Sequence, residues 1–145
     1  MAVGQAERLV PMIAETMREA GWSWAEVELI AVTLGPGTFT GIRVGLAAAR
    51  GLALAAGRPC VGVSTHEAMA AAVGTGRPLL CVVRGRQGTV FAQPFAATGA
   101  PLGGPRATRA EAVDALRPDA ALLVEDADLV AGPAVAAAAL RRLRA

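Results

Sequence analysis

The sequence contains few aromatic residues and little of the side-chain chemistry that builds metal or redox sites. Tyrosine is absent, aromatic residues make up 3% of the 145 residues, and His66 is the single histidine. Since 54% of the residues are hydrophobic, the core has to be built mainly from alanine, valine and leucine. Cys60 and Cys81 are widely spaced in short apolar runs, so we expect both to be buried and reduced. His66 has no evident neighbouring ligand residues, and we expect it on the surface of a helix's first turn.

The net charge of the chain is also small, which argues against nucleic acid as a direct partner. The formal net charge is +2 and the pI is about 9.0. The arginines that carry this excess form no stripe interleaved with aromatic residues, so direct nucleic-acid binding is not expected. No apolar run long enough to cross a membrane is free of glycine and charge, and we recognise no signal peptide. We therefore expect a cytoplasmic protein with no membrane partner.

The most informative stretch, residues 29–56, has the pattern of a strand, a glycine-rich loop and a helix. Residues 29–34 are mostly apolar, residues 35–41 are rich in turn formers, and residues 42–56 are helix formers closed by Gly57. This order directs backbone N–H groups and a helix N-terminus to one spot, which could hold an anion. The candidate anion-binding residues are Gly35, Gly37, Thr38, Thr40 and Gly41.

Two interpretations of this loop stay open. The loop contains no lysine and its spacing is not G-x-G-x-x-G, so it is neither a Walker-type phosphate loop nor a dinucleotide fingerprint. Its residues either bind an anion or only shape a tight strand-to-helix turn, with Thr38 or Thr40 capping the helix.

Two predicted helices carry faces that suit close packing. The helix over 5–20 has an apolar stripe, although Pro11 either marks its first turn or kinks it. The helix over 42–56 has a face almost free of bulk, because small residues recur at three- and four-residue steps. Such faces either pack in the core or receive a partner helix. The candidate interface residues are Leu9, Met12, Ile13, Thr16, Met17, Gly45, Ala48, Ala49 and Leu52.

The remaining chain alternates strands and helices, which predicts an α/β sandwich. The further strands are expected over 60–63, 79–83, 89–95 and 120–124. Ser64 and Thr108 each open a capping box, S/T-x-x-E. The further helices are expected over 64–73, 108–116 and 133–143. Residues 74–78 are the expected domain boundary, and the acidic turn 125–128 could bind a cation, although most such turns are simply solvated.

Three segments of the chain resemble the TsaB (YeaZ) family. The strongest match is GPGTFTGIRVGLAAARGLALAAGRPCVGVST at 35–65. The segments QAERLVPMIAETMREAG at 5–21 and CVVRGRQGTVFAQPF at 81–95 resemble the family's first helix and the hairpin that opens its second domain. The resemblance implies an α/β fold of the RNase H-like, actin/Hsp70 (ASKHA) superfamily type, with two small lobes at 1–77 and 78–145. In that family the opening strands precede the matching stretch, so we expect the N-terminal lobe to be truncated.

The resemblance also implies a function. The TsaB family is the non-catalytic partner subunit in bacterial tRNA threonylcarbamoyladenosine synthesis, so we expect no enzymatic activity and no cofactor. The helices over 5–20 and 42–56 are expected to bind the catalytic TsaD-type subunit or a second copy of the chain. The pathway's ATPase subunit is then an indirect partner, and no direct contact with tRNA is expected. The alternative is an actin-like nucleotide- or phosphate-binding domain, or an enzyme, that uses the loop 35–41.

Two positions depart from the family's pattern. Gln5 stands where many relatives carry histidine, and this helix lacks the paired histidines that hold a metal in TsaD-type relatives, so no metal site is expected. Arg84 stands where an aspartate is usual, which puts in doubt any hydrogen bonds that this carboxylate would give the hairpin.

Overall fold

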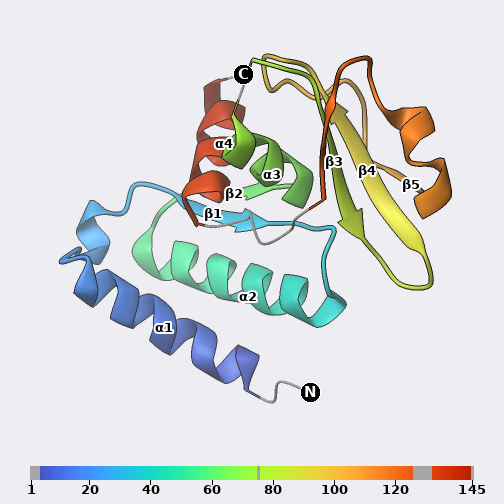
Figure 1. Cartoon of the computed structure of the whole chain (residues 1–145). Helices are drawn as coiled ribbons and strands as arrows, with labels where there is room; N and C mark the ends of the chain where they lie inside the picture. The colour runs from blue at the N-terminus through green and yellow to red at the C-terminus, as the bar shows by residue number, and fades with distance from the viewer. Residues whose placement is uncertain (1–3, 75, 126–131, 145) are drawn as a thin grey trace.

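A computed structural model describes residues 4–74, 76–125 and 132–144, and it shows a mixed α/β fold with two sheets (Figure 1). The helices and strands are α1 (Gln5–Glu19), β1 (Ile30–Thr33), α2 (Phe39–Ala56), β2 (Cys60–Val63), α3 (Thr65–Val73), β3 (Leu79–Arg84), β4 (Thr89–Phe95), β5 (Arg106–Arg109), β6 (Leu122–Val124) and α4 (Gly132–Arg144). Short 3-10 turns lie at Trp24–Glu26, Ala110–Ala112 and Asp114–Leu116.

The first sheet consists of β1 and β2, which run parallel with Ile30 opposite Cys60. Successive strand residues point to opposite faces, so each face receives its own helix. On one face, Val32 points toward α2, where its Cγ2 lies 3.9 Å from the place a Cβ on Gly45 would take. On the other face, Val63 packs against α4. The sheet therefore lies between two helical layers, as Figure 1 shows for β1 between α2 and α4.

The second sheet has the order β5-β4-β3-β6, with β3 antiparallel to β4 and parallel to β6. Its two faces bury separate apolar clusters. The face that packs against α3 buries Met69, Ala70, Leu79, Cys81, Val83, Phe95 and Val124. The opposite face, which the two 3-10 turns after β5 cover, buries Leu80, Val82, Val90, Ala92 and Val113. The strand residues alternate between the two clusters, as the pleat requires.

Helix α4 connects the two halves of the chain. It comes from the C-terminal end, yet it packs against α3 and against β1 and β2 of the first sheet. The lobe boundary expected at 74–78 stays a prediction, and Thr75 lies outside the described residues. So do residues 126–128 of the expected acidic turn.

Local sequence signals locate the start and end of several elements correctly. The capping box of α3 is present, because the Ser64 hydroxyl accepts from the Glu67 amide at 3.0 Å and the Glu67 carboxylate accepts from the Ser64 amide at 2.6 Å. Gly57 closes α2 with a φ of 61°, and the bounds of β2 and β4 agree with those expected. Pro11 lies inside a continuous α1 rather than at its first turn.

The prediction of a helix over residues 108–116 is wrong. Thr108, which was expected to cap it, belongs to β5 and pairs with Val90 of β4. The Arg109 guanidinium also donates to the Gln87 carbonyl at 2.8 Å, which holds this segment against the β3–β4 turn. Strand pairing therefore replaces the cap, and the residues that follow form only two short 3-10 turns.

Two burial expectations are wrong as well. Cys60 is exposed at the start of β2, whereas Cys81 is buried as expected and burial raises the pKa of its thiol to about 12. His66 is fully buried, because the first turn of α3 faces β4 rather than solvent. Its Nε2 lies 2.9 Å from the Phe91 carbonyl, which can only accept, so Nε2 carries the proton. Nδ1 has no hydrogen-bond partner among the described residues.

Lowering the pH is expected to destabilise the fold through His66. Burial lowers the pKa of its imidazole, and this effect outweighs the Phe91 carbonyl and Glu67, which both raise it. The unfolded chain therefore binds more protons once the pH falls below about 6.5, so the free energy of unfolding falls there and is restored at higher pH. Urea unfolding between about pH 5 and pH 8 measures this slope. In H66Q this contribution to the slope should disappear, and an unchanged slope would contradict the assignment.

Replacing either of two glycines of α2 by alanine is expected to change the free energy of unfolding, in opposite directions. Gly51 is exposed in the helix interior and nothing lies within 4 Å of an added Cβ, so Gly51→Ala should raise the free energy of unfolding by about 0.5–1 kcal/mol. A Cβ on Gly41 would lie 2.7 Å from the Thr38 hydroxyl oxygen that caps the helix, so Gly41→Ala should lower that free energy. Chemical denaturation of both variants checks the pair. A stabilised Gly41→Ala would contradict the cap geometry.

Candidate functional site

The glycine-rich loop after β1 is held in place by hydrogen bonds within the chain. The Thr65 amide donates to the Gly35 carbonyl at 2.8 Å, and the Thr65 hydroxyl donates to the Pro36 carbonyl at 2.7 Å. The Thr38 hydroxyl accepts from the Gly41 amide at 3.2 Å and so caps α2. These contacts fix the loop between β1, α2 and the start of α3. They show that Thr38, one of the two capping candidates, is the cap.

The remaining loop residues lie at the surface. Gly37 and Thr40 are exposed on either side of the cap, and Phe39 is 69% exposed beneath the Arg43 guanidinium, 3.8 Å from its ring centroid. The structure therefore brings the five candidate anion-binding residues together around the start of α2. Whether they bind an anion stays a prediction.

The predicted interface residues of α1 and α2 fall on different surfaces. Most of them line a groove of about 460 Å³, which we call the inner groove. It is lined by Leu9 and Ile13 of α1, by Gly45, Ala48, Ala49 and Leu52 of α2, by Leu29 and Ile30–Thr33 at β1, and by Gly132, Val135 and Ala136 of α4. Met12 and Thr16 point to solvent instead, and Met17 is half-buried.

A second surface of the same helix pair is a hollow of about 390 Å³, which we call the outer hollow. It is lined by Val10, Ala14, Trp24, Leu52, Ala55 and Ala56. Val10 is 50% exposed. Leu54 of α2, which is close in sequence to Leu52 and Ala55 but does not line the hollow, is 86% exposed. Apart from Leu52, the sequence analysis missed these residues. Helical spacing could have identified them, because apolar residues three or four positions apart share a face. These are Val10 with Ala14 in α1, and Leu52 with Ala55 and Ala56 in α2.

Helix α2 is unusually apolar for a helix with so little burial. It is the one helix among the described residues that is long and apolar enough, by length and composition alone, to cross a membrane, and few of its residues are buried. A core helix passes the same test, and α2 packs on β1, β2 and α1. The apolar residues of α2 thus face the first sheet on one side, and the inner groove and the outer hollow on others.

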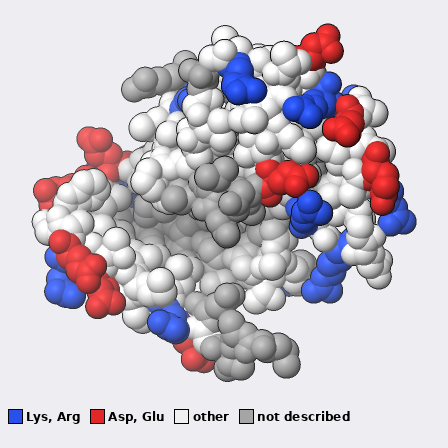
Figure 2. All heavy atoms as spheres, in the orientation of Figure 1, with Lys and Arg blue, Asp and Glu red and all other residues white. Residues whose placement is uncertain are grey.

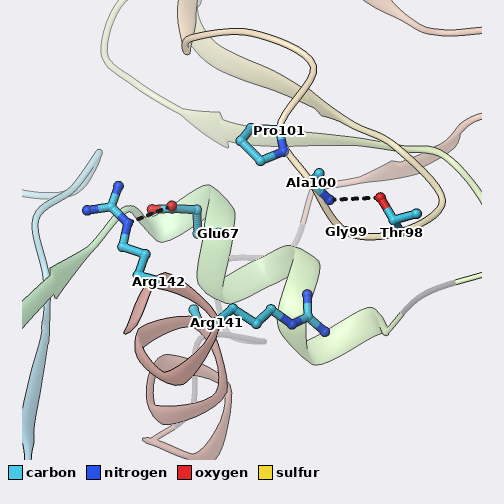
Figure 3. A pocket seen from close by; sticks show the side chains of 8 residues that line it. Glu67, Thr98, Gly99, Ala100, Pro101, Arg141 and Arg142 are labelled. Atoms are coloured by element: carbon cyan, nitrogen blue, oxygen red, sulfur yellow. Dashed lines mark hydrogen bonds and ion pairs between the residues drawn. The ribbon is translucent and has the colours of Figure 1, made fainter. Parts of the chain in front are cut away.

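A third cavity, of about 410 Å³, lies between α3, α4 and the loop after β4 (Figure 3). Two of its charged side chains are paired, because the Arg142 Nε donates to Glu67 at 2.9 Å and another nitrogen of Arg142 donates to the Gly62 carbonyl at 3.0 Å. Burial alone would raise the pKa of Glu67, but the Ser64 amide and Arg142 together lower it. Arg141 extends away from this pair (Figure 3). The ion pair anchors α4 to α3.

Charged side chains do not gather into a patch of one sign on the face that Figure 2 shows. Acidic and basic residues alternate along α1 and around the opposite rim. Arg84, for example, pairs with Glu125 at 3.0 Å. Within the described ranges, no group of three or more His, Cys, Asp and Glu side chains is placed to hold a metal ion.

Comparison with known proteins gives consistent matches. Residues 4–127 match the model of the family described as TsaD, tRNA N6-adenosine threonylcarbamoyltransferase. The chain is 46% identical over 66 residues to the tRNA N6-adenosine threonylcarbamoyltransferase of Erythrobacter litoralis, which covers 46% of this chain and 19% of that protein. It is 42% identical over 64 residues to the tRNA threonylcarbamoyladenosine biosynthesis protein TsaB of Escherichia coli, which covers 44% of this chain and 28% of TsaB. The aligned part thus spans less than a third of these relatives.

The fold also resembles that of a solved structure. YeaZ from Pseudomonas aeruginosa superposes with a TM-score of 0.73 and 24% sequence identity, over 99% of this chain and 80% of YeaZ. This likeness confirms a mixed α/β fold that resembles that of YeaZ. Because the family model covers most of the chain and TsaB proteins match 44–46% of it, the chain belongs to the TsaD family as a TsaB/YeaZ-like member.

Proposed function

We propose that this chain is a non-catalytic subunit that supports threonylcarbamoyl transfer to adenosine 37 of tRNA by binding a catalytic TsaD-type subunit. Sequence likeness alone leaves the choice between roles open, since both transferases and TsaB proteins match stretches of similar length. The observation that carries the proposal is the exposed apolar surface that α1 and α2 form around the outer hollow.

This surface has the features of a helix-binding site. The large apolar side chains Val10 and Trp24 both line the hollow and are exposed, and exposed apolar patches mark interaction surfaces. Between them lie Ala14 and Ala55, whose small side chains let a partner helix approach closely. Covering apolar surface stabilises a complex by about 25 cal/mol per Å². A partner helix laid along α1 and α2 would bury these residues without displacing any part of the described fold.

The same proposal covers the other expected partners. A second copy of the chain can use this surface in an isologous dimer, which would compete with the catalytic subunit. The ATPase subunit of the pathway would associate only indirectly, and neither tRNA nor a membrane would be bound directly. We propose a cytoplasmic location with no metal or cofactor of its own. Two lobes divided at 74–78 remain part of this proposal.

Val10→Arg is expected to weaken binding of the TsaD-type subunit at least tenfold. The substitution places a charge among the residues that line the outer hollow, where a partner would have to desolvate it. Val10 is half exposed, so the free energy of unfolding should change by less than about 0.5 kcal/mol. Titration calorimetry with the purified catalytic subunit of the same organism measures the affinity.

Leu102→Arg is the matched control for this variant. Leu102 has a similar exposure, 57%, but lies in the loop between β4 and β5, away from α1 and α2. It should bind the catalytic subunit as the wild type does. If Val10→Arg also binds like the wild type, or if both variants lose binding equally, this surface does not bind the catalytic subunit.

The alternative function, nucleotide binding at the loop 35–41, is tested by titrating ATP and magnesium into the chain. We expect no saturable heat, because the Gly41 amide, one of the N–H groups at the start of α2, already donates to the Thr38 hydroxyl. Micromolar binding that Gly37→Val removes, with the fold intact, would favour the nucleotide-binding role over the proposed one.

A further inference from the structure

The cavity between α3, α4 and the loop after β4 has walls that hydrogen bonds hold on both sides (Figure 3). On one side, the Arg142 guanidinium of α4 donates to Glu67 of α3 at 2.9 Å. On the other side the loop folds back on itself, because the Gly99 amide donates to the Ala96 carbonyl and the Ala96 amide donates to the Ala100 carbonyl, both at 2.8 Å. The space between these walls therefore exists before anything binds in it.

The charged side chains that line this cavity leave one positive charge in excess. Both carboxylate oxygens of Glu67 already accept hydrogen bonds, one from Arg142 at 2.9 Å and the other from the Ser64 amide at 2.6 Å. Arg141 lines the same cavity and forms no ion pair with any carboxylate among the described residues. Figure 3 shows its side chain across the cavity from Pro101 and apart from the Glu67–Arg142 pair. The Arg141 guanidinium can therefore receive a negatively charged group.

The rest of the lining is small or apolar. Ala138 of α4 is buried, Ala100 and Pro101 come from the loop, and the methylene stems of the two arginines add apolar surface. The cavity measures about 410 Å³. Small-molecule sites measure roughly 300–1,000 Å³ and combine apolar walls with a few polar groups that orient the ligand. An inorganic anion would leave these walls uncovered, whereas an apolar body with one negative group matches both features.

We propose that this cavity is a binding site for a small organic monoanion, an aryl or alkyl carboxylate, whose charge pairs with Arg141 and whose apolar body lies between Ala138 and the loop 98–101. A carboxylate can accept two parallel hydrogen bonds from one guanidinium. The ligand would contact α4 and the loop together, and so would join the C-terminal helix to the second sheet. The cavity shares no lining residue with the outer hollow or the inner groove, so the site does not rest on the proposed binding of the catalytic subunit.

The probe is 2-naphthoate, a flat aromatic carboxylate, and its matched probe is 2-naphthamide, which has nearly the same shape and no charge. Each is titrated into the full chain, labelled with nitrogen-15, and followed by two-dimensional NMR. We expect 2-naphthoate to shift the amide signals of Gly99, Ala100 and Ala138 saturably. 2-Naphthamide should bind about threefold more weakly or worse, because an exposed charge pair contributes a factor of this order. Added salt should reduce the difference between the two probes, since it screens the charge pair.

Arg141→Gln and Arg50→Gln form the matched pair of variants. Both arginines are exposed on helices, but Arg50 of α2 does not line the cavity. Arg141→Gln should reduce the affinity for 2-naphthoate to that for 2-naphthamide and leave the affinity for the amide unchanged, whereas Arg50→Gln should change neither. Arg141→Lys keeps the charge and should retain most of the affinity for 2-naphthoate. Ala100→Trp places a large side chain at the cavity and should weaken the binding of both probes. Circular dichroism checks that each variant is folded.

Three results with the wild-type chain would overturn the proposal. They are the absence of saturable shifts with either probe, equal affinities for the two probes, and shifts confined to α1 and α2. A folded Arg141→Gln variant that binds 2-naphthoate as the wild type does would also overturn it. The proposed function is tested separately, because Val10→Arg should bind 2-naphthoate unchanged. A chain that binds 2-naphthoate at this cavity but does not bind the catalytic subunit would contradict the proposed function alone.

Discussion

The parallel pairing of β1 with β2 is the constraint on which the rest of the structure depends. It brings the carboxyl ends of both strands to one edge, so that the loop after β1 meets the start of α3. Thr65 then bonds to the Gly35 and Pro36 carbonyls and fixes the direction in which α2 leaves the sheet. The sheet also separates α2 from α4, since Val32 and Val63 point to opposite faces. Both open surfaces of α2 follow from this placement.

Signals that act within a few residues were predictable from the sequence. The capping box at Ser64 depends only on a side chain and an amide three residues apart, so it forms wherever the helix does. Gly57 likewise ends α2 by its own backbone conformation. Thr108 carries the same capping signal but belongs to a strand, because β4 offers it a ladder of backbone hydrogen bonds instead. A cap and a strand compete for the same backbone groups, and the outcome depends on a neighbour that the sequence does not reveal.

The position of a residue relative to distant elements was the part that could not be predicted. His66 begins a helix, where an exposed place is the usual one, yet β4 packs against that turn and buries the ring completely. The helical periodicity of α1 and α2 identified residues that share a face but not what that face meets. Leu9 and Ala48 were therefore grouped with Met12, although the first two line the inner groove and Met12 points to solvent.

The inner groove and the outer hollow are built from the same two helices, α1 and α2. Helix α1 contacts α2, and its stripe of Leu9 and Ile13 faces the groove rather than a packed core. Among the described residues, α2 is the element that α1 contacts most. Leu52 lines both surfaces, so a substitution at this one residue changes the groove and the hollow together, whereas Val10 and Ala48 each belong to one of them.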